Sequence, residues 1–111
     1  MSTSDRALLE MAAKAAGIGP VIGFAVEPCE LMIGPRAYVR YWRPLKDDGD
    51  ALRLAVKLKL EIYFFDGFSE VVAEHNTASF EPGREQYAED MNAATRRAIV
   101  RAAAEIGRSM P

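Results

Sequence analysis

The sequence has few of the residues that carry most protein chemistry, with one cysteine, one histidine and one tryptophan in 111 residues. Cys29 has no partner for an internal disulfide and no second cysteine or histidine at metal-ligand spacing, which favours a reducing compartment. Glu27 and Glu30 flank it and would raise its thiol pKa, so a nucleophilic role is disfavoured. His75 has no serine or cysteine placed beside it by a motif, so we interpret it as a polar residue at a strand end. These absences predict a protein that is not an enzyme.

Long apolar runs and glycine-rich phosphate loops are also lacking. No stretch approaches the ~18 consecutive apolar residues of a membrane span, and the N-terminus does not resemble a signal peptide. Neither a Walker motif nor a dinucleotide-binding fingerprint is present. The formal net charge is −2, so no overall positive field would draw the chain onto duplex DNA. We therefore expect a cytoplasmic protein with no cofactor, no membrane contact and no duplex nucleic acid.

What is present is the composition of an ordinary globular domain. Half of the residues are hydrophobic and 27% are charged, without internal repeats or low-complexity tracts. At this length one domain, residues 1–111, is expected to bury roughly 60–70% of the surface of its unfolded chain.

Apolar periodicity and capping residues predict three helices. The first expected helix covers residues 5–16, with a cap at Ser4 or Asp5 and an end at Gly17. The second runs from its Asp47 cap to about Leu58. The third starts after an Asn92 cap and ends at Gly107. The second helix is expected to turn Leu52, Ala55 and Val56 inward.

Alternating polarity predicts four to five strands. The strands of the clearest pair are residues 60–65 and 70–75, joined at Asp66-Gly67. Further strands are expected at residues 20–26, with Gly23 as a bulge or a close-packing point, and at 36–42. Residues 31–33 suit a loop insertion or a brief edge strand. Residues 76–91 are expected to form a long loop, which could contain a short strand near residues 77–81. The expected class is α+β, a mainly antiparallel sheet of four to five strands packed with three α-helices.

Two arginines at the start of the third helix are the clearest binding signal. With Asn92 as the cap, no acid lies in the first turn, and Arg96 and Arg97 lie where the helix dipole is already positive. Free backbone N–H groups, the Thr95 hydroxyl and two guanidinium groups are what a phosphate or carboxylate site uses. Trp42 with Arg43, at the end of an expected strand, would supply an aromatic face for a base and a further cation. This site requires Trp42 and Arg43 to lie beside the two arginines.

Acidic residues support a different interpretation of the same arginines. Glu89 and Asp90, or the run of residues 47–50, would neutralise them as structural ion pairs. The run also has the carboxylates of a calcium loop, but Leu58 stands where the closing glutamate belongs. Helix capping explains these aspartates, so no metal site is expected.

The segments 42–58 and 94–108 resemble small phage and prophage proteins. The order of elements is similar to that of the phage αβα-sandwich domain group, in which a helix after a Trp- or Ser-containing junction and a late alanine-rich helix flank the sheet. The resemblance implies a phage-encoded accessory protein that acts in the host-cell cytoplasm. Phage proteins of this size include oligomeric sponges for the cyclic nucleotide signals of bacterial defence.

Two function classes follow. The first, by analogy, is a non-catalytic anti-defence protein that sequesters a small phosphorylated ligand such as a cyclic nucleotide. Its expected binding residues are Trp42, Arg43, Asn92, Thr95, Arg96 and Arg97. The alternative is an inhibitor or adaptor that binds a host protein through an aromatic and acidic surface. The alanine-rich helix and the aromatic strands also favour a homo-oligomer.

Overall fold

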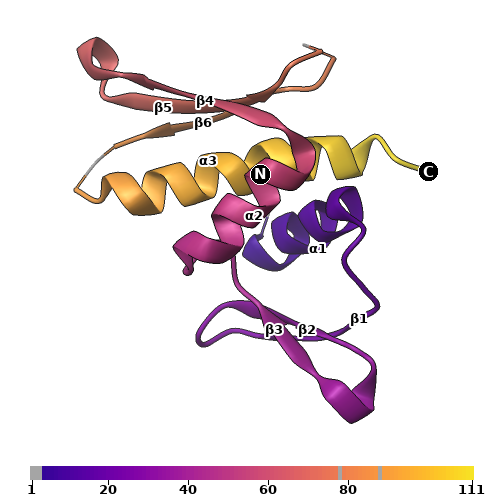
Figure 1. Ribbon diagram of the computed structural model, residues 1–111. Coiled ribbons are helices and arrows are strands. Elements are labelled where there is room, and N and C mark those ends of the chain that lie inside the picture. The colour runs from indigo at the N-terminus through magenta and orange to yellow at the C-terminus, as the bar shows by residue number, and fades with distance from the viewer. Residues whose placement is uncertain (1–3, 78, 88) are drawn as a thin grey trace.

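The computed structural model describes residues 4–77, 79–87 and 89–111, and it has three layers (Figure 1). Three helices lie between two separate antiparallel sheets of three strands each. The α+β class, the three helices and the antiparallel pairing are as expected. The expectation of a single sheet of four to five strands is wrong, because the helices separate the strands into two groups that cover opposite faces of the helical layer.

The elements follow one another along the chain in a simple order. They are α1 (Asp5–Ala16), β1 (Val21–Ala25), β2 (Glu30–Ile33), β3 (Arg40–Trp42), α2 (Asp48–Leu58), β4 (Leu60–Phe65), β5 (Glu70–His75), β6 (Gly83–Gln86) and α3 (Met91–Arg108), with short 3-10 turns at Arg36–Tyr38 and Asp66–Phe68. The first sheet has the order β1-β2-β3 and the second the order β4-β5-β6. Among the described residues, none of the helices combines the length and the apolar content that a bilayer crossing requires.

Side-chain caps set the helix starts. The Ser4 hydroxyl accepts a hydrogen bond from the Ala7 N–H at 3.1 Å, and the Asp47 carboxylate accepts one from the Asp50 N–H at 2.8 Å. Both capping predictions are confirmed. The third is wrong, because Asp90 caps α3 by accepting from the Ala93 N–H at 2.9 Å. A carboxylate two residues earlier satisfies the same orphan donors, so Asn92 becomes part of the first turn.

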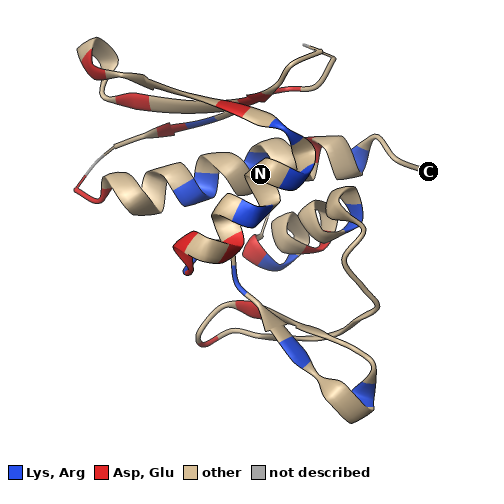
Figure 2. Ribbon diagram, viewed as in Figure 1, with Lys and Arg blue, Asp and Glu red and all other residues tan. Residues whose placement is uncertain are grey.

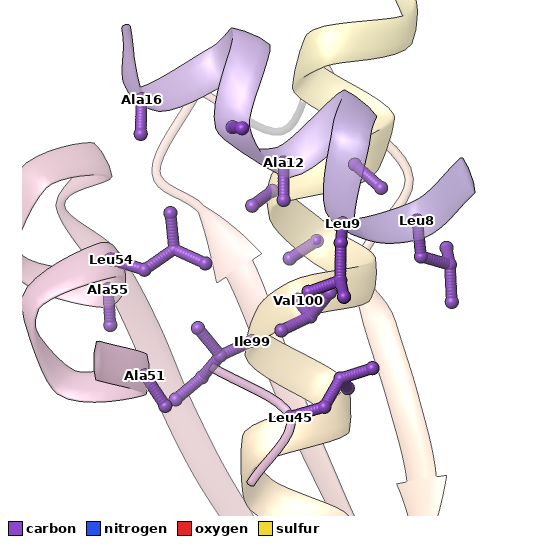
Figure 3. Close-up of a cluster of buried hydrophobic side chains, with 14 of the residues drawn as sticks. Leu8, Leu9, Ala12, Ala16, Leu45, Ala51, Leu54, Ala55, Ile99 and Val100 are labelled. Atoms are coloured by element: carbon purple, nitrogen blue, oxygen red, sulfur yellow. The ribbon is translucent and has the colours of Figure 1, made fainter. Parts of the chain in front are cut away.

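The core lies among the three helices, which contribute leucine, isoleucine and valine to a shared cluster (Figure 3). Leu9 of α1 and Val100 of α3 are fully buried there. The predicted inward face of α2 is wrong except at Ala55, because Leu52 and Val56 are exposed while Ala51 and Leu54 are buried. The predicted face and the observed buried face both have helical spacing, and one is offset from the other by a single residue. Only the contact with α3 therefore decides which face of α2 is buried.

Strand predictions are correct where the partner strand is a neighbour along the chain. The hairpin of β4 and β5 is confirmed over residues 60–65 and 70–75. The bulge at Gly23 is confirmed by a register shift between β1 and β2.

Three strand predictions are wrong. Residues 31–33 belong to the central strand of the first sheet, since β2 pairs with both β1 and β3. Residues 36–42 split into a 3-10 turn and a strand of three residues. The short strand near 77–81 does not form at residue 77 or 79–81, and Ala78 lies outside the described residues. The strand of this segment is β6 instead.

Two glycines allow backbones to pack against each other without side chains between them. A Cβ atom on Gly83 of β6 would overlap the Ala98 carbonyl oxygen of α3 and lie 2.8 Å from the Ala102 nitrogen. A Cβ atom on Gly107 of α3 would overlap the Met11 carbonyl oxygen of α1 and lie 2.7 Å from its carbon. Glycine is therefore required where α3 meets β6 and where it meets α1.

Candidate functional site

The six predicted binding residues do not form one site. Asn92, Thr95 and Arg96 line a groove bounded by α2, α3 and β4, whereas Trp42 lines a separate pocket next to β3. Arg97 turns toward α1 and β6, and Arg43 toward β2. The groove therefore brings Asn92, Thr95 and Arg96 together, but Trp42 and Arg43 do not lie beside the two arginines as the predicted site required.

Arg96 joins the third helix to the start of the second. Its Nη1 atom lies 2.5 Å from the Asp48 Oδ1 atom, and its Nε donates a hydrogen bond to the Leu45 carbonyl oxygen at 3.0 Å. Asp48 belongs to the acidic run that the alternative interpretation named, and Figure 2 shows this acidic start of α2. The guanidinium group is mostly buried, so the contacts fasten α3 to the junction before α2.

Arg97 also takes part in ion pairs. Its Nη2 atom lies 2.6 Å from the Asp5 Oδ1 atom at the start of α1, and its Nε lies 3.9 Å from Glu85 Oε1 of β6. Glu85 pairs with Arg101 as well. The Thr95 hydroxyl donates to the Met91 carbonyl oxygen at 2.8 Å. The side chains of Thr95, Arg96 and Arg97 thus have partners within the chain, which favours structural ion pairs over an anion site there.

The junction between β3 and α2 is held in a similar way. The Asp50 Oδ2 atom accepts a hydrogen bond from the Arg43 N–H at 3.0 Å, and the Arg43 side chain lies 3.8 Å from Glu30 Oε2. Trp42 is only 8% exposed and belongs to the core cluster. Most of the Trp42 surface is therefore used in packing, and the part that remains faces the pocket beside β3.

That pocket is a stronger candidate for an anion site than the start of α3. It lies between β3, α2 and the end of α1 and has a volume of about 300 Å³. Its apolar lining comprises Ala16, Ile18, Ile33 and Leu54. Tyr41, which is 58% exposed, and Trp42 add aromatic surface to the wall. Binding sites for small ligands typically combine such an apolar lining with a few polar groups.

The charge of this pocket is positive. Arg40, Arg53 and Lys57 line it, against one carboxylate, Asp50. Asp50 is occupied by Arg53, whose Nη2 atom lies 2.7 Å from Asp50 Oδ1. Within the described part of the chain, Arg40 and Lys57 have no carboxylate in ion-pair distance. Figure 2 shows the basic positions on the second half of α2 and on β3. Two cations are therefore available to a bound anion.

Of the residues that line this pocket, only Trp42 was among the six predicted binding residues. Arg53 and Lys57 are one helical turn apart, which is a visible signal for a shared face. Arg40 precedes Trp42 by two residues, so both are on the same side of a strand. Nothing in either pattern says that α2 packs beside β3, and this placement creates the pocket.

Over residues 4–77, 79–87 and 89–111, no group of three histidine, cysteine or acidic side chains could hold a metal ion. His75 Nδ1 contacts the Thr77 hydroxyl at 2.9 Å, as a polar residue at a strand end would. The pocket beside β3 places cationic side chains next to an aromatic and apolar wall, which are groups that an anion with an aromatic or apolar part would contact.

Cys29 is expected to react slowly with thiol reagents. Burial raises its pKa, and the nearby Asp5 carboxylate raises it further. Because only the thiolate is nucleophilic, labelling by iodoacetamide near pH 8 should be several-fold slower than for a free cysteine peptide. The raised pKa also means that the unfolded thiol ionises first, so stability should fall as the pH rises above the usual thiol value of 9.0. A labelling rate equal to that of the peptide would contradict this.

The sequence matches no protein-family model, and no characterised protein or solved structure is similar enough to count as a match.

Proposed function

We propose that this chain is a non-catalytic binding protein that holds a small phosphorylated ligand in the pocket between β3, α2 and the end of α1. The observation that carries the proposal is the presence of Arg40 and Lys57, which have no ion-pair partner among the described residues, beside the aromatic side chains Tyr41 and Trp42. A cyclic nucleotide has the matching chemistry, a phosphate beside a base. The cellular role proposed with it is that of a phage-encoded anti-defence protein that sequesters such a signal in the host cytoplasm.

The geometry supports this ligand class in three ways. The volume of about 300 Å³ is at the lower end of the range for small-molecule sites. Tyr41 is exposed at the wall, where a base would stack on its ring. Arg53, held by Asp50, keeps its guanidinium group at the pocket, while Arg40 and Lys57 bind the phosphate.

Calorimetry with a panel of cyclic mononucleotides, cyclic dinucleotides, nucleoside monophosphates and unphosphorylated nucleosides tests the proposal. We expect at least one phosphorylated compound to bind and the unphosphorylated nucleosides to bind much more weakly. Arg40→Gln and Lys57→Gln should each weaken binding about tenfold or more, because each removes a charge-assisted hydrogen bond.

Two control variants make this test specific. Arg36→Gln removes the same charge from an exposed position outside the pocket and should leave the affinity unchanged. Arg96→Gln should lower the stability but not the affinity, since Arg96 contacts Leu45 and Asp48. If no phosphorylated compound binds, or if Arg36→Gln weakens binding as much as Arg40→Gln, the proposal is wrong.

An inhibitor or adaptor of a host protein is the second candidate, and one observation favours it. The face of the second sheet that carries Glu61, Tyr63 and Phe65 is both acidic and aromatic, because Glu74 and Glu70 lie opposite the first and last of these residues. The Tyr63 and Phe65 rings are 6.2 Å apart and at least 40% exposed. Aromatic side chains at such positions are frequent anchors of protein interfaces.

Affinity capture from host lysate separates the two candidates. If the second is correct, Tyr63→Ala and Phe65→Ala together should abolish capture of a specific host protein, whereas Arg40→Gln and Lys57→Gln should not. If the pocket variants abolish capture and the aromatic variants do not, this surface is not the binding site.

A further inference from the structure

The edge of the second sheet at β4 has the features of an interface. The strand order β4-β5-β6 leaves one side of β4 without a neighbouring strand among the described residues. The six residues of β4 are Leu, Glu, Ile, Tyr, Phe and Phe. Proteins usually protect an open edge strand with lysine, proline, a bulge or a covering element, because it can pair with another chain. The β4 sequence contains neither lysine nor proline, Glu61 is its one charged residue, and its pairing with β5 is regular over all six residues.

An exposed apolar groove adjoins this edge. It is bounded by α2, α3 and β4, and has a volume of about 240 Å³. Leu52, Phe64 and Met91 line it and are exposed, the first two by 62% and 52%. Ile62 and Ile99 complete its apolar surface. Large apolar side chains gathered beside an open strand are typical of a surface that is covered in the functional state.

The total surface area is large for the mass of the chain. A monomer of 12.2 kDa is expected to expose about 6,100 Å². This chain exposes 6774 Å². The excess of roughly 700 Å² is close to the ~800 Å² that one partner contributes to a standard interface. One copy of the chain therefore has an amount of surface that suits one further contact of ordinary size.

We infer that a second copy of this chain covers the β4 edge and the groove. Two β4 strands would pair antiparallel about a two-fold axis and join the two sheets into one of six strands. With Tyr63 opposite Tyr63 of the second copy, Ile62 lies opposite Phe64 and Glu61 opposite Phe65. Residues directly opposite each other share a face, so the apolar groove side of each copy meets that of the other. No like charges face each other in this register.

Two-fold symmetry explains why the same chain suits both sides. A symmetric dimer uses one self-complementary patch, which here combines main-chain hydrogen bonds at β4 with the apolar side chains Leu52, Phe64 and Met91. The pocket beside β3 is outside this contact. The acidic, aromatic face of the sheet would continue across the paired β4 strands, because Glu61, Tyr63 and Phe65 belong to β4. The dimer is thus independent of the proposed ligand.

Sedimentation of the full chain across micromolar concentrations tests the inference. We expect a mass of twice 12.2 kDa for the native sequence. The double variant with Leu52→Glu and Phe64→Glu should raise the dissociation constant about a hundredfold or more, because it places carboxylates in the apolar contact. Val26→Glu is the matched control, since Val26 is 74% exposed in the turn between β1 and β2. It should leave the dimer intact.

Hydrogen exchange of the native protein gives a second measurement that does not depend on a variant. Every second amide of β4 faces the open edge and should be protected in the dimer, with protection that falls on dilution. If the native protein is monomeric at high micromolar concentration, the inference is wrong, and a different partner would have to cover the β4 edge and the groove. A dimer that survives the double variant with β4 edge amides unprotected also overturns it, because the interface is then elsewhere.

Discussion

Replacing Gly83 with alanine is expected to lower the free energy of unfolding by about 3 kcal/mol, the upper part of the range for overpacking. The new methyl group would overlap the backbone of α3 at Ala98 and lie 2.8 Å from the Ala102 nitrogen. Both contacts are in the middle of α3, where the helix cannot fray, so the strand must move away. The resulting gap would separate β6 from α3. Denaturant titration of the two proteins measures the difference.

Gly67→Ala is the matched control for this substitution. A methyl group on Gly67 would meet no other part of the chain within 4 Å, and Gly67 lacks the positive φ angle that would strain an alanine. The control should therefore leave the stability unchanged or raise it by up to about 1 kcal/mol through the unfolded state. Equal effects of Gly83→Ala and Gly67→Ala would contradict the close contact between β6 and α3.

Gly107→Ala is expected to destabilise the protein by about 2 kcal/mol. Alanine favours a helix over glycine by about 1 kcal/mol, so the substitution would be stabilising if α3 were isolated. Against this gain, the methyl group would overlap the Met11 carbonyl oxygen of α1 and lie 2.7 Å from its carbon. The close contact should cost more than the gain in helix propensity, because α1 and α3 form the most extensive contact between helices.

Thermal unfolding with circular dichroism measures this effect. A melting temperature several degrees below that of the native protein is expected, since about 1 kcal/mol corresponds to roughly 4–8 °C in a domain of this size. A rise in melting temperature would contradict the prediction and would mean that the last turn of α3 moves without cost.

The helix positions were predictable because they depend on local chemistry. Ser4 and Asp47 each cap the helix that follows, and Gly17 takes the left-handed conformation that ends α1. The cap of α3 was not predictable, because Asp90 and Asn92 are both good capping residues and are only two positions apart. Local signals locate a helix terminus but do not choose between such neighbours.

The division into two sheets was not predictable from the pattern of the strands. Each strand shows alternation or a short apolar run, but alternation does not name the partner strand. Prolines and glycines surround β2 as they would an edge strand or a loop, yet Leu31 and Ile33 are fully buried as its central-strand residues. The buried face of α2 was not predictable for the same reason, because packing against α3 decides which side of the helix is buried.

The candidate site shows the same limit. Arg96 pairs with Asp48, which was among the acids considered, whereas the Asp5 partner of Arg97 is 92 residues away in the sequence. The pocket beside β3 depends on Arg40 and Lys57, whose elements are adjacent only after folding. Residue types alone predicted an anion site at Arg96 and Arg97, whereas the site now proposed is built on other cationic residues.

The central position of α3 has a consequence for synthesis of the protein. This helix, residues 91–108, supplies much of the core and contacts α1, α2 and the second sheet. A nascent chain that has not yet released these residues from the ribosome has two sheets and two helices without the element that joins them. Its apolar surfaces stay exposed until translation has passed α3, so this domain is not expected to fold before α3 has left the ribosome.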